Sequence, residues 1–211
     1  TGRLTTKRTS NPILTMKSKF RELIKPTNSW LMSLDYNGAE IRTFLSLSGH
    51  EQPEEDIHKW NMTHLYGGSP IDREEAKVRF FSSFYNPEDN SLNESIYSRK
   101  HVLDAYYDGA RVKTSFGRSI KVDQRRAFNY VIQSTTADLT IDRAIALDKA
   151  LEDCKSKVAF IIHDEIVLDI HAEDRYKIPE LKEVFQNTKL GRFRANVKAG
   201  KNYGVMKEIE L

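Results

Sequence analysis

Acidic side chains at the ends of apolar strands are the feature of this sequence that most directly indicates chemistry. Asp164 and Glu165 interrupt the apolar run IIHDEIVLDI (161–170), and Asp35 follows the apolar part of a second run, WLMSLDY (30–36). Burying an ionised carboxylate is costly unless it is paired or binds a cation. Carboxylates that converge from neighbouring strands can hold the two divalent ions of a phosphoryl-transfer site. For the tripeptide His-Asp-Glu alone, the favoured alternative is a turn whose acids face water.

A row of four side chains recurs at four-residue spacing within DREEAKVRFFSSFY (72–85). Its members are Arg73, Lys77, Phe81 and Tyr85. Residues four apart share one face of a helix, so this row presents two cations and then two aromatic rings. The cations could bind a triphosphate and the rings a base, through charge-assisted hydrogen bonds and stacking. The alternative is a solvated charged end joined to an aromatic end that faces the core.

A second row with the same spacing consists of long polar side chains. Arg125, Asn129 and Gln133 would form one stripe on a helix. Three such donors could follow the minor groove of a nucleic acid, whose acceptors vary little with base sequence. A plain solvated helix face is the alternative.

Hydrophobic periodicity and helix start and stop signals indicate the elements that must position these residues. The predicted elements are strands at 30–36, 158–162, 166–170 and 193–198, and helices at 40–47, 72–85 and 124 to about 151. The second and third strands are close enough to form a tight hairpin, with the two acids at or beside its tip. The fourth alternates apolar and polar residues, which predicts a half-exposed edge strand with a basic outer face.

Composition sets wide limits. The chain has 211 residues, of which 39% are hydrophobic, enough for one domain or for one domain with an attached lobe. No apolar run is long enough to cross a bilayer, so no membrane partner is expected. One cysteine excludes an internal disulfide and suits a reducing compartment, which makes the cytoplasm the expected location. The net charge of +3 permits a polyanionic partner without requiring one.

Taken in order, these segments resemble the C-terminal polymerase region of family A DNA polymerases, with a phage-like character. The stretches that carry the resemblance are TGRLTT (1–6), LDYNGAEIR (34–42), DIH (56–58), DREEAKVRFFSSFY (72–85), QRRAFNYVIQSTTADL (124–139) and IIHDEIVLDI (161–170). They are similar to the family's TGRLSS element, its motif A, its DIH tripeptide, its fingers helix, its R-x3-N-x3-Q segment and its motif C. Together they cover the chain from Thr1 to about Tyr203.

The resemblance implies an α+β fold: a polymerase palm, made of an antiparallel sheet backed by helices, with a reduced helical fingers lobe. The fingers would occupy approximately residues 51–113, and the palm approximately residues 1–50 and 114–211. The thumb and the 3′→5′ exonuclease would precede Thr1 and are expected to be absent from this chain. It would then be one piece of a split or truncated polymerase in the cytoplasm of a bacterial or phage-infected cell, and a separate chain could supply the thumb or the exonuclease.

By the same resemblance the acids acquire roles in template-directed DNA synthesis. Asp35 and Asp164 would bind two Mg²⁺ ions, with Glu165 as an accessory acid. One ion would activate the primer 3′-hydroxyl, and the other would neutralise the leaving pyrophosphate. Lys77 would donate a proton to that leaving group, so the implied catalytic set is Asp35, Asp164, Glu165 and Lys77.

The remaining implied sites bind dNTPs and primer–template DNA. The implied nucleotide-binding residues are Glu40, His58, Arg73, Lys77, Phe81 and Tyr85. The implied DNA-binding residues are Arg3, Arg125, Asn129, Gln133 and His163, the last of these beside the primer end.

Two positions narrow the expected substrate. Glu40 matches the family's steric gate against a 2′-hydroxyl, so deoxynucleotides are expected over ribonucleotides. The related single-subunit RNA polymerases lack that glutamate. Phe81 stands where a tyrosine hydroxyl helps some members to accept dideoxynucleotides, so this chain is expected to discriminate against them.

The sequence also departs from the family pattern. Asn37-Gly38-Ala39 replaces the usual Ser-Gln-Ile of motif A, FGRSIKV (116–122) keeps one arginine of a GRRR-like run, and the stretch 85–114 is short. Two alternatives therefore stay open. One is an inactive DNA-binding or assembly subunit with a polymerase-like fold. The other is a metal-dependent nuclease that uses the same acids.

Overall fold

The computed structural model describes residues 1–7, 9–10, 12–67, 71–86, 88–89, 91–92 and 95–210. These residues form two compact units. The sheet unit consists of residues 2–36 and 137–211, and the helical unit consists of Thr1 and residues 37–136. Within the described residues, no helix is long and apolar enough to cross a membrane.

The sheet unit is built on five antiparallel strands in the order β4-β5-β1-β8-β9. The strands are β1 (Trp30–Tyr36), β4 (Lys157–Ile162), β5 (Glu165–Ile170), β8 (Ala195–Gly200) and β9 (Lys207–Glu208).

The predicted palm-like α+β fold is confirmed. The predicted hairpin is also present, with a two-residue turn, because Ile162 pairs directly with Glu165. The prediction of an edge strand at 193–198 was wrong, since β8 lies between β1 and the short β9.

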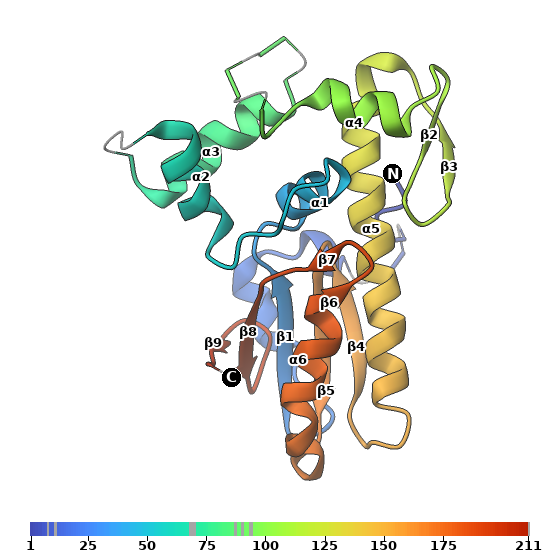
Figure 1. Cartoon of the computed structure of the whole chain (residues 1–211). Coiled ribbons are helices and arrows are strands. Elements are labelled where there is room, and N and C mark those ends of the chain that lie inside the picture. Colours follow the sequence, from blue (N-terminus) through green and yellow to red (C-terminus); the bar gives the residue numbers. More distant parts are fainter. Residues whose placement is uncertain are drawn as a thin grey trace. The chain divides into compact units, whose positions relative to one another are not determined.

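Strand alternation gives this sheet two different faces. On one face, Met32, Leu34, Ile166 and Leu168 are completely buried. Helix α6 (Ile178–Gln186) covers that face (Figure 1). Tyr36 ties α6 to the sheet, because its ring stacks on Phe185 at a centroid distance of 4.0 Å and its hydroxyl donates to the Phe185 carbonyl at 2.7 Å.

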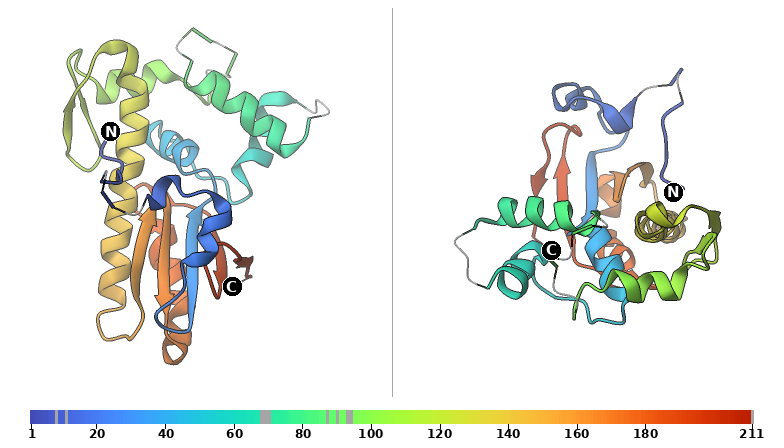
Figure 2. Two further views of the ribbon diagram at one scale, coloured as in Figure 1. Left: turned by 180° about the vertical axis from the view of Figure 1, so that it is seen from behind. Right: turned by 90° about the horizontal axis from the view of Figure 1, so that it is seen from above.

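The opposite face carries the acids, and the N-terminal segment covers part of it. Helices η1 (Ile13–Thr15) and η2 (Ser18–Leu23) cross it, as the left view of Figure 2 shows. Ile13, Leu14 and Ile24 pack there against a cluster that includes Leu31 and Tyr203. The rest of the unit comprises η3 (Ala172–Lys177), β6 (Asn187–Thr188), β7 (Gly191–Arg192) and the second half of α5 (Gln124–Ala150).

The helical unit is organised around an aromatic core. Its elements are α1 (Ala39–Leu47), α2 (Ile57–Tyr66), α3 (Arg73–Phe84), α4 (Arg99–Tyr106), the hairpin of β2 (Arg111–Lys113) and β3 (Ser119–Lys121), and the first half of α5. Phe44, Phe80, Phe84, Tyr97 and Phe128 make mostly edge-to-face ring contacts and are at most 7% exposed.

Side-chain caps define where three of these helices begin. The side chains of Asp56, Asp72 and Ser98 accept hydrogen bonds from backbone N–H groups in the first turns of α2, α3 and α4. The helix predicted at 72–85 thus has Asp72 as its cap rather than as its first turn.

Gly38 is required by both conformation and space. Its φ of +72° is in the left-handed region, and a Cβ placed there would lie 2.4 Å from Cγ2 of Ile57. We expect Gly38→Ala to lower the free energy of unfolding by about 2–3 kcal/mol, since it adds overpacking to backbone strain. Denaturant unfolding provides the measurement.

Gly109→Ala is the matched control. Gly109 also has a positive φ, +94°, but nothing lies within 4 Å of a Cβ there. The free energy of unfolding is therefore expected to fall by about 1 kcal/mol, from backbone strain alone. Equal losses for the two variants would contradict the role of Ile57.

Candidate active site

The β4–β5 turn and strand β1 bring the predicted acids to one end of the sheet. Asp35 pairs with Glu165 in the β1–β5 register, so their side chains start from opposite positions on neighbouring strands. Asp164 is the second residue of the two-residue turn, next to Glu165. His163, the first turn residue, has a φ of 56° and is exposed. The three acids are half-buried.

Two hydroxyl groups engage the carboxylate of Glu165. The Ser33 hydroxyl donates to its Oε1, and the Tyr203 hydroxyl donates to its Oε2 at 2.8 Å. Burial and the adjacent Glu165 charge raise the pKa of Tyr203 above its ordinary value. Sequence analysis missed both donors. Ser33 could have been found, because it lies two positions before Asp35 on the same strand face, whereas no local signal connects Tyr203 with Glu165.

The acids fit a magnesium site that is completed by substrate. Among the described residues, no group of three or more His, Cys, Asp or Glu side chains forms a metal cage. Mg²⁺ commonly binds through one or two protein carboxylates, while water and substrate phosphates complete its coordination. Asp35 and Asp164, as hard oxygen donors at one end of the sheet, are sufficient for that mode.

The predicted row on α3 begins with a strongly paired arginine. The Arg73 guanidinium donates through Nε and Nη2 to Asp56, with a closest distance of 2.8 Å, and through Nη1 to Glu74 at 2.6 Å. Lys77 is 45% exposed, and its ammonium lies 4.0 Å from Glu74. Of the two cations, Lys77 is therefore the one less committed to protein carboxylates.

The other end of the row is aromatic. Phe81 and Tyr85 lie nearly parallel, with centroids 6.2 Å apart. The Tyr85 hydroxyl donates to Oε2 of Glu40, which joins the aromatic end of α3 to the first turn of α1. The structure thus brings Glu40, Phe81 and Tyr85 together, as the predicted nucleotide site requires.

Asp56 is the centre of a half-buried polar network that sequence analysis missed. Its carboxylate accepts from Arg73, from the Asn37 amide at 2.6 Å and from the N–H groups of His58 and Lys59. Burial alone would raise its pKa, but these hydrogen bonds together hold the pKa of Asp56 well below its usual range. Asn37, one of the departures in motif A, therefore supports the capping acid of α2.

His58 lies next to this network and is uncharged at neutral pH. It is 4% exposed, and burial, assisted by the charge of Arg73, lowers its pKa to about 4. Its Nδ1 has no hydrogen-bond partner within the described part of the chain. Its ring lies 6.1 Å from that of Phe81, so the tripeptide DIH adjoins the predicted nucleotide row.

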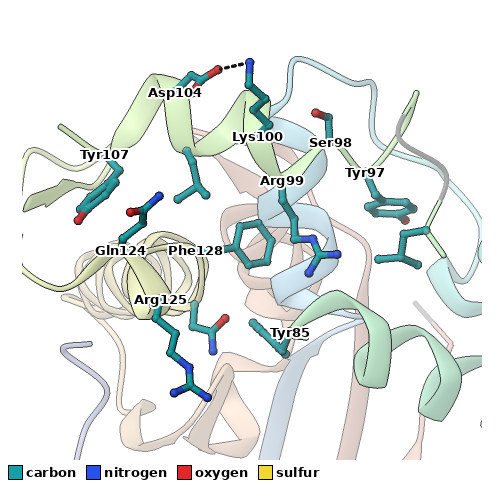
Figure 3. Close-up of a pocket in the computed structure, with 13 residues that line it drawn as sticks. Tyr85, Tyr97, Ser98, Arg99, Lys100, Asp104, Tyr107, Gln124, Arg125 and Phe128 are labelled. Atoms are coloured by element: carbon teal, nitrogen blue, oxygen red, sulfur yellow. Dashed lines mark ion pairs between the residues drawn. The ribbon is translucent and has the colours of Figure 1, made fainter. Parts of the chain in front are cut away.

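The stripe on α5 borders a pocket in the helical unit. Arg125 and Asn129 line this pocket with Tyr85, Phe128 and Arg99, as Figure 3 shows for the labelled side chains. Its volume is about 630 Å³. The pocket combines cations, amides and ring faces, which suits an unpaired nucleotide.

The other predicted DNA contacts are not part of that pocket. Gln133 is half-buried farther along α5. In the sheet unit, Arg3 is exposed, and His163 borders a small hollow with Gly2 and Leu4.

The β2–β3 hairpin carries cations to which sequence analysis assigned no role. Arg118, the arginine retained in FGRSIKV, donates to the carbonyls of Thr1 and Ser134 and so has a structural role. Arg111 pairs directly with Lys121 across the hairpin, and both are exposed. Like charges directly opposite each other destabilise a strand pair, which makes this face a candidate for binding a polyanion.

The chain matches a family model and several curated proteins. A family model described as DNA polymerase family A matches residues 94–205, more than half of the chain. The DNA polymerase I of Lactococcus lactis subsp. lactis (strain IL1403) is 27% identical over 220 residues, covering 81% of this chain and 25% of that protein. The DNA polymerase of Mycobacterium phage D29 is 28% identical over 178 residues, covering 68% of this chain and 29% of that protein.

A solved structure shows the same fold. The POL domain of Pol1 from M. smegmatis, in complex with DNA primer-template and dNTP, superposes with a TM-score of 0.77 at 17% identity. The match covers 96% of this chain and 46% of the other. The chain spans about a quarter of the length of the curated relatives.

The depressed pKa of Asp56 predicts a pH-dependent contribution to stability. A carboxyl with a lower pKa when folded stabilises the protein above its unfolded pKa of about 4, and this stabilisation is lost as the pH falls. We expect Asp56→Asn to lower the free energy of unfolding by about 1–2 kcal/mol at pH 7. The difference from the wild type should narrow as the pH falls from about 5 towards 2.

Asp104→Asn is the control, because Asp104 is an exposed partner of Lys100. We expect this substitution to change the free energy of unfolding by less than about 0.5 kcal/mol. Denaturant unfolding over a pH series measures both variants. A difference between Asp56→Asn and the wild type that does not change with pH would contradict the account.

Proposed function

The chain belongs to DNA polymerase family A, and on this premise we propose that it carries a nucleotidyl-transfer site that adds dNTPs to a primer 3′-hydroxyl on a DNA template. The observation that carries the proposal is the pairing of Asp35 with Glu165, with Asp164 in the adjoining turn. The assignment of the fingers to 51–113 and of the palm to 1–50 and 114–211 stays a prediction.

Asp35 and Asp164 are the proposed magnesium ligands. The chemistry that two bound Mg²⁺ ions supply is activation of the primer hydroxyl and neutralisation of charge on the leaving pyrophosphate. The chain's own contribution is to hold both carboxylates at one end of a packed sheet, with Asp35 on β1 and Asp164 in the β4–β5 turn. Half-buried carboxylates of like charge repel one another, and a bound cation would relieve that repulsion.

The nucleotide would bind the row on α3. Lys77 is the proposed proton donor to the leaving group, and its exposure and loose pairing with Glu74 leave it accessible to a phosphate. Arg73 can reach a triphosphate by exchanging its bonds to Asp56 and Glu74 for bonds to phosphate oxygens. A neutral His58 can donate one hydrogen bond to a phosphate while adding no charge.

Sugar and base recognition would come from the aromatic end of the row. Glu40, held by the Tyr85 hydroxyl, is the proposed barrier to a 2′-hydroxyl. Phe81 and Tyr85 would pack on the new base pair. The absence of a hydroxyl at position 81 supports the expected discrimination against dideoxynucleotides.

Primer–template DNA is a further proposed ligand. Arg3, Arg125, Asn129 and Gln133 would contact the duplex near its terminus, and His163 would lie by the primer end. A separate chain carrying a thumb or an exonuclease is a further proposed partner, since the thumb grips the duplex in polymerases of this family.

Primer extension tests the proposal. With Mg²⁺ and dNTPs, we expect the chain, alone or with a thumb-bearing partner, to lengthen a labelled primer. Asp164→Ala should reduce the rate by about a hundredfold or more, because a charged metal ligand is lost. Asp153→Ala, at an exposed acid of the same unit, should be unaffected. Shortening of the primer would support a nuclease, and no change under any condition would support an inactive assembly subunit.

The basic face of the β2–β3 hairpin yields a second test. Replacing Arg111 and Lys121 with Ala should weaken DNA binding and lower the slope of log affinity against log salt by about 2, one for each lost phosphate contact. Removing the opposed charges should leave stability unchanged or higher. The control is the double replacement of Lys59 and Arg79 on α2 and α3, and an equal effect there would contradict a specific role for the hairpin.

A further inference from the structure

The two hydroxyl donors on Glu165 suggest a role beyond packing. We propose that Ser33 and Tyr203 are positioning residues that hold Glu165 as a fixed hydrogen-bonded acid, so that a divalent cation binds Asp35 and Asp164 without Glu165 as a ligand. This inference rests on the proposed function, because it concerns the metal site of that reaction.

Strand register determines the position of Ser33. Ser33 and Asp35 lie two residues apart on β1, so their side chains leave the same face, and Asp35 is opposite Glu165. Ser33 is 2% exposed. A buried serine hydroxyl here has the Glu165 carboxylate as its acceptor, and that pairing directs Oε1 back along β1, away from the β4–β5 turn that contains Asp164.

Contacts on several sides hold Tyr203. Its backbone N–H donates to the Ile24 carbonyl at 2.9 Å, and its ring meets Phe160 edge-to-face at 5.3 Å. The Arg21 guanidinium lies over the ring, 5.2 Å from the centroid. The next residue, Gly204, approaches η2 so closely that a Cβ there would lie 2.6 Å from the Glu22 backbone nitrogen.

These contacts make Tyr203 a rigid donor. It is 6% exposed, and its ring cannot turn without losing the contacts with Phe160 and Arg21. With the hydroxyl fixed at 2.8 Å from Oε2, both oxygens of Glu165 have a protein donor. Glu165 could become a cation ligand only by giving up at least one of these two hydrogen bonds.

The arrangement also affects two like charges. Asp35 and Glu165 are opposite each other, a position in which like charges destabilise the strand pair. Two hydroxyl donors stabilise the charge of the Glu165 carboxylate and fix its two oxygens. Releasing Glu165 would add a third negative group to the cation site, which should strengthen cation binding while disturbing the geometry.

The test is Mn²⁺ binding to the whole chain, measured by electron paramagnetic resonance of free Mn²⁺ without DNA or dNTP. We expect Tyr203→Phe, which removes only the hydroxyl, to lower the Mn²⁺ dissociation constant by about threefold or more. Ser33→Ala should shift it in the same direction. In a Glu165→Gln background, Tyr203→Phe should have no effect, because the released charge is absent.

Tyr107→Phe is the matched control. The Tyr107 hydroxyl donates to the Gly109 carbonyl in the helical unit, so its loss should leave Mn²⁺ binding unchanged. Thermal unfolding shows whether each variant is folded. If Tyr203→Phe does not fold, Mn²⁺ binding to Ser33→Ala tests the inference.

The outcomes separate the inference from the function on which it rests. Weaker or unchanged Mn²⁺ binding in the folded variants would overturn the inference, as would an equal shift in the Glu165→Gln background. Weaker binding would mean that the hydroxyls orient Glu165 as a ligand. If Mn²⁺ binding to the wild type does not depend on Asp35 and Asp164, the proposed metal site fails as well.

Discussion

The antiparallel register between β1 and β5 is the constraint on which the candidate site depends. It places Asp35 opposite Glu165, and the two-residue turn after β4 then leaves Asp164 beside them. Slipping β1 by one residue would move its acid to the α6 face and take Met32 and Leu34, which are fully buried there, away from α6. Burial of the apolar side chains of β1 and β5 against α6 therefore fixes the positions of the acids on the opposite face. Core packing in this way determines the geometry of the candidate site.

In the helical unit, too, an interaction that stabilises the fold determines where candidate binding residues lie. Its polar row is organised by Asp56, which caps α2, holds Arg73 and accepts from Asn37. Because the same carboxylate stabilises the fold and occupies the arginine, a phosphate must compete with a well-satisfied partner for Arg73. The Lys77 ammonium lies 4.0 Å from the Glu74 carboxylate, so an incoming anion would engage it more readily than Arg73. In the proposed nucleotide site, stability and phosphate binding would thus be coupled through the Asp56 carboxylate.

The sequence was sufficient for elements and patterns that are local. Apolar runs predicted β1 and the β4–β5 hairpin, and four-residue spacing placed the row on α3, because such patterns depend on neighbouring residues alone. The bond between Tyr203 and Glu165 joins residues 38 apart, and nothing local indicates it. The error at β8 has the same origin, since β9 is only two residues long and gives no alternating pattern to indicate that β8 has a second neighbour.

A crystal of the chain soaked in Mn²⁺, with the ion located by anomalous scattering, tests the central claim most directly. The account predicts manganese within bonding distance of carboxylate oxygens of Asp35 and Asp164, with Glu165 still bound to the hydroxyls of Ser33 and Tyr203. Manganese at Glu165 with those two hydrogen bonds broken, or no manganese at this end of the sheet, would contradict it.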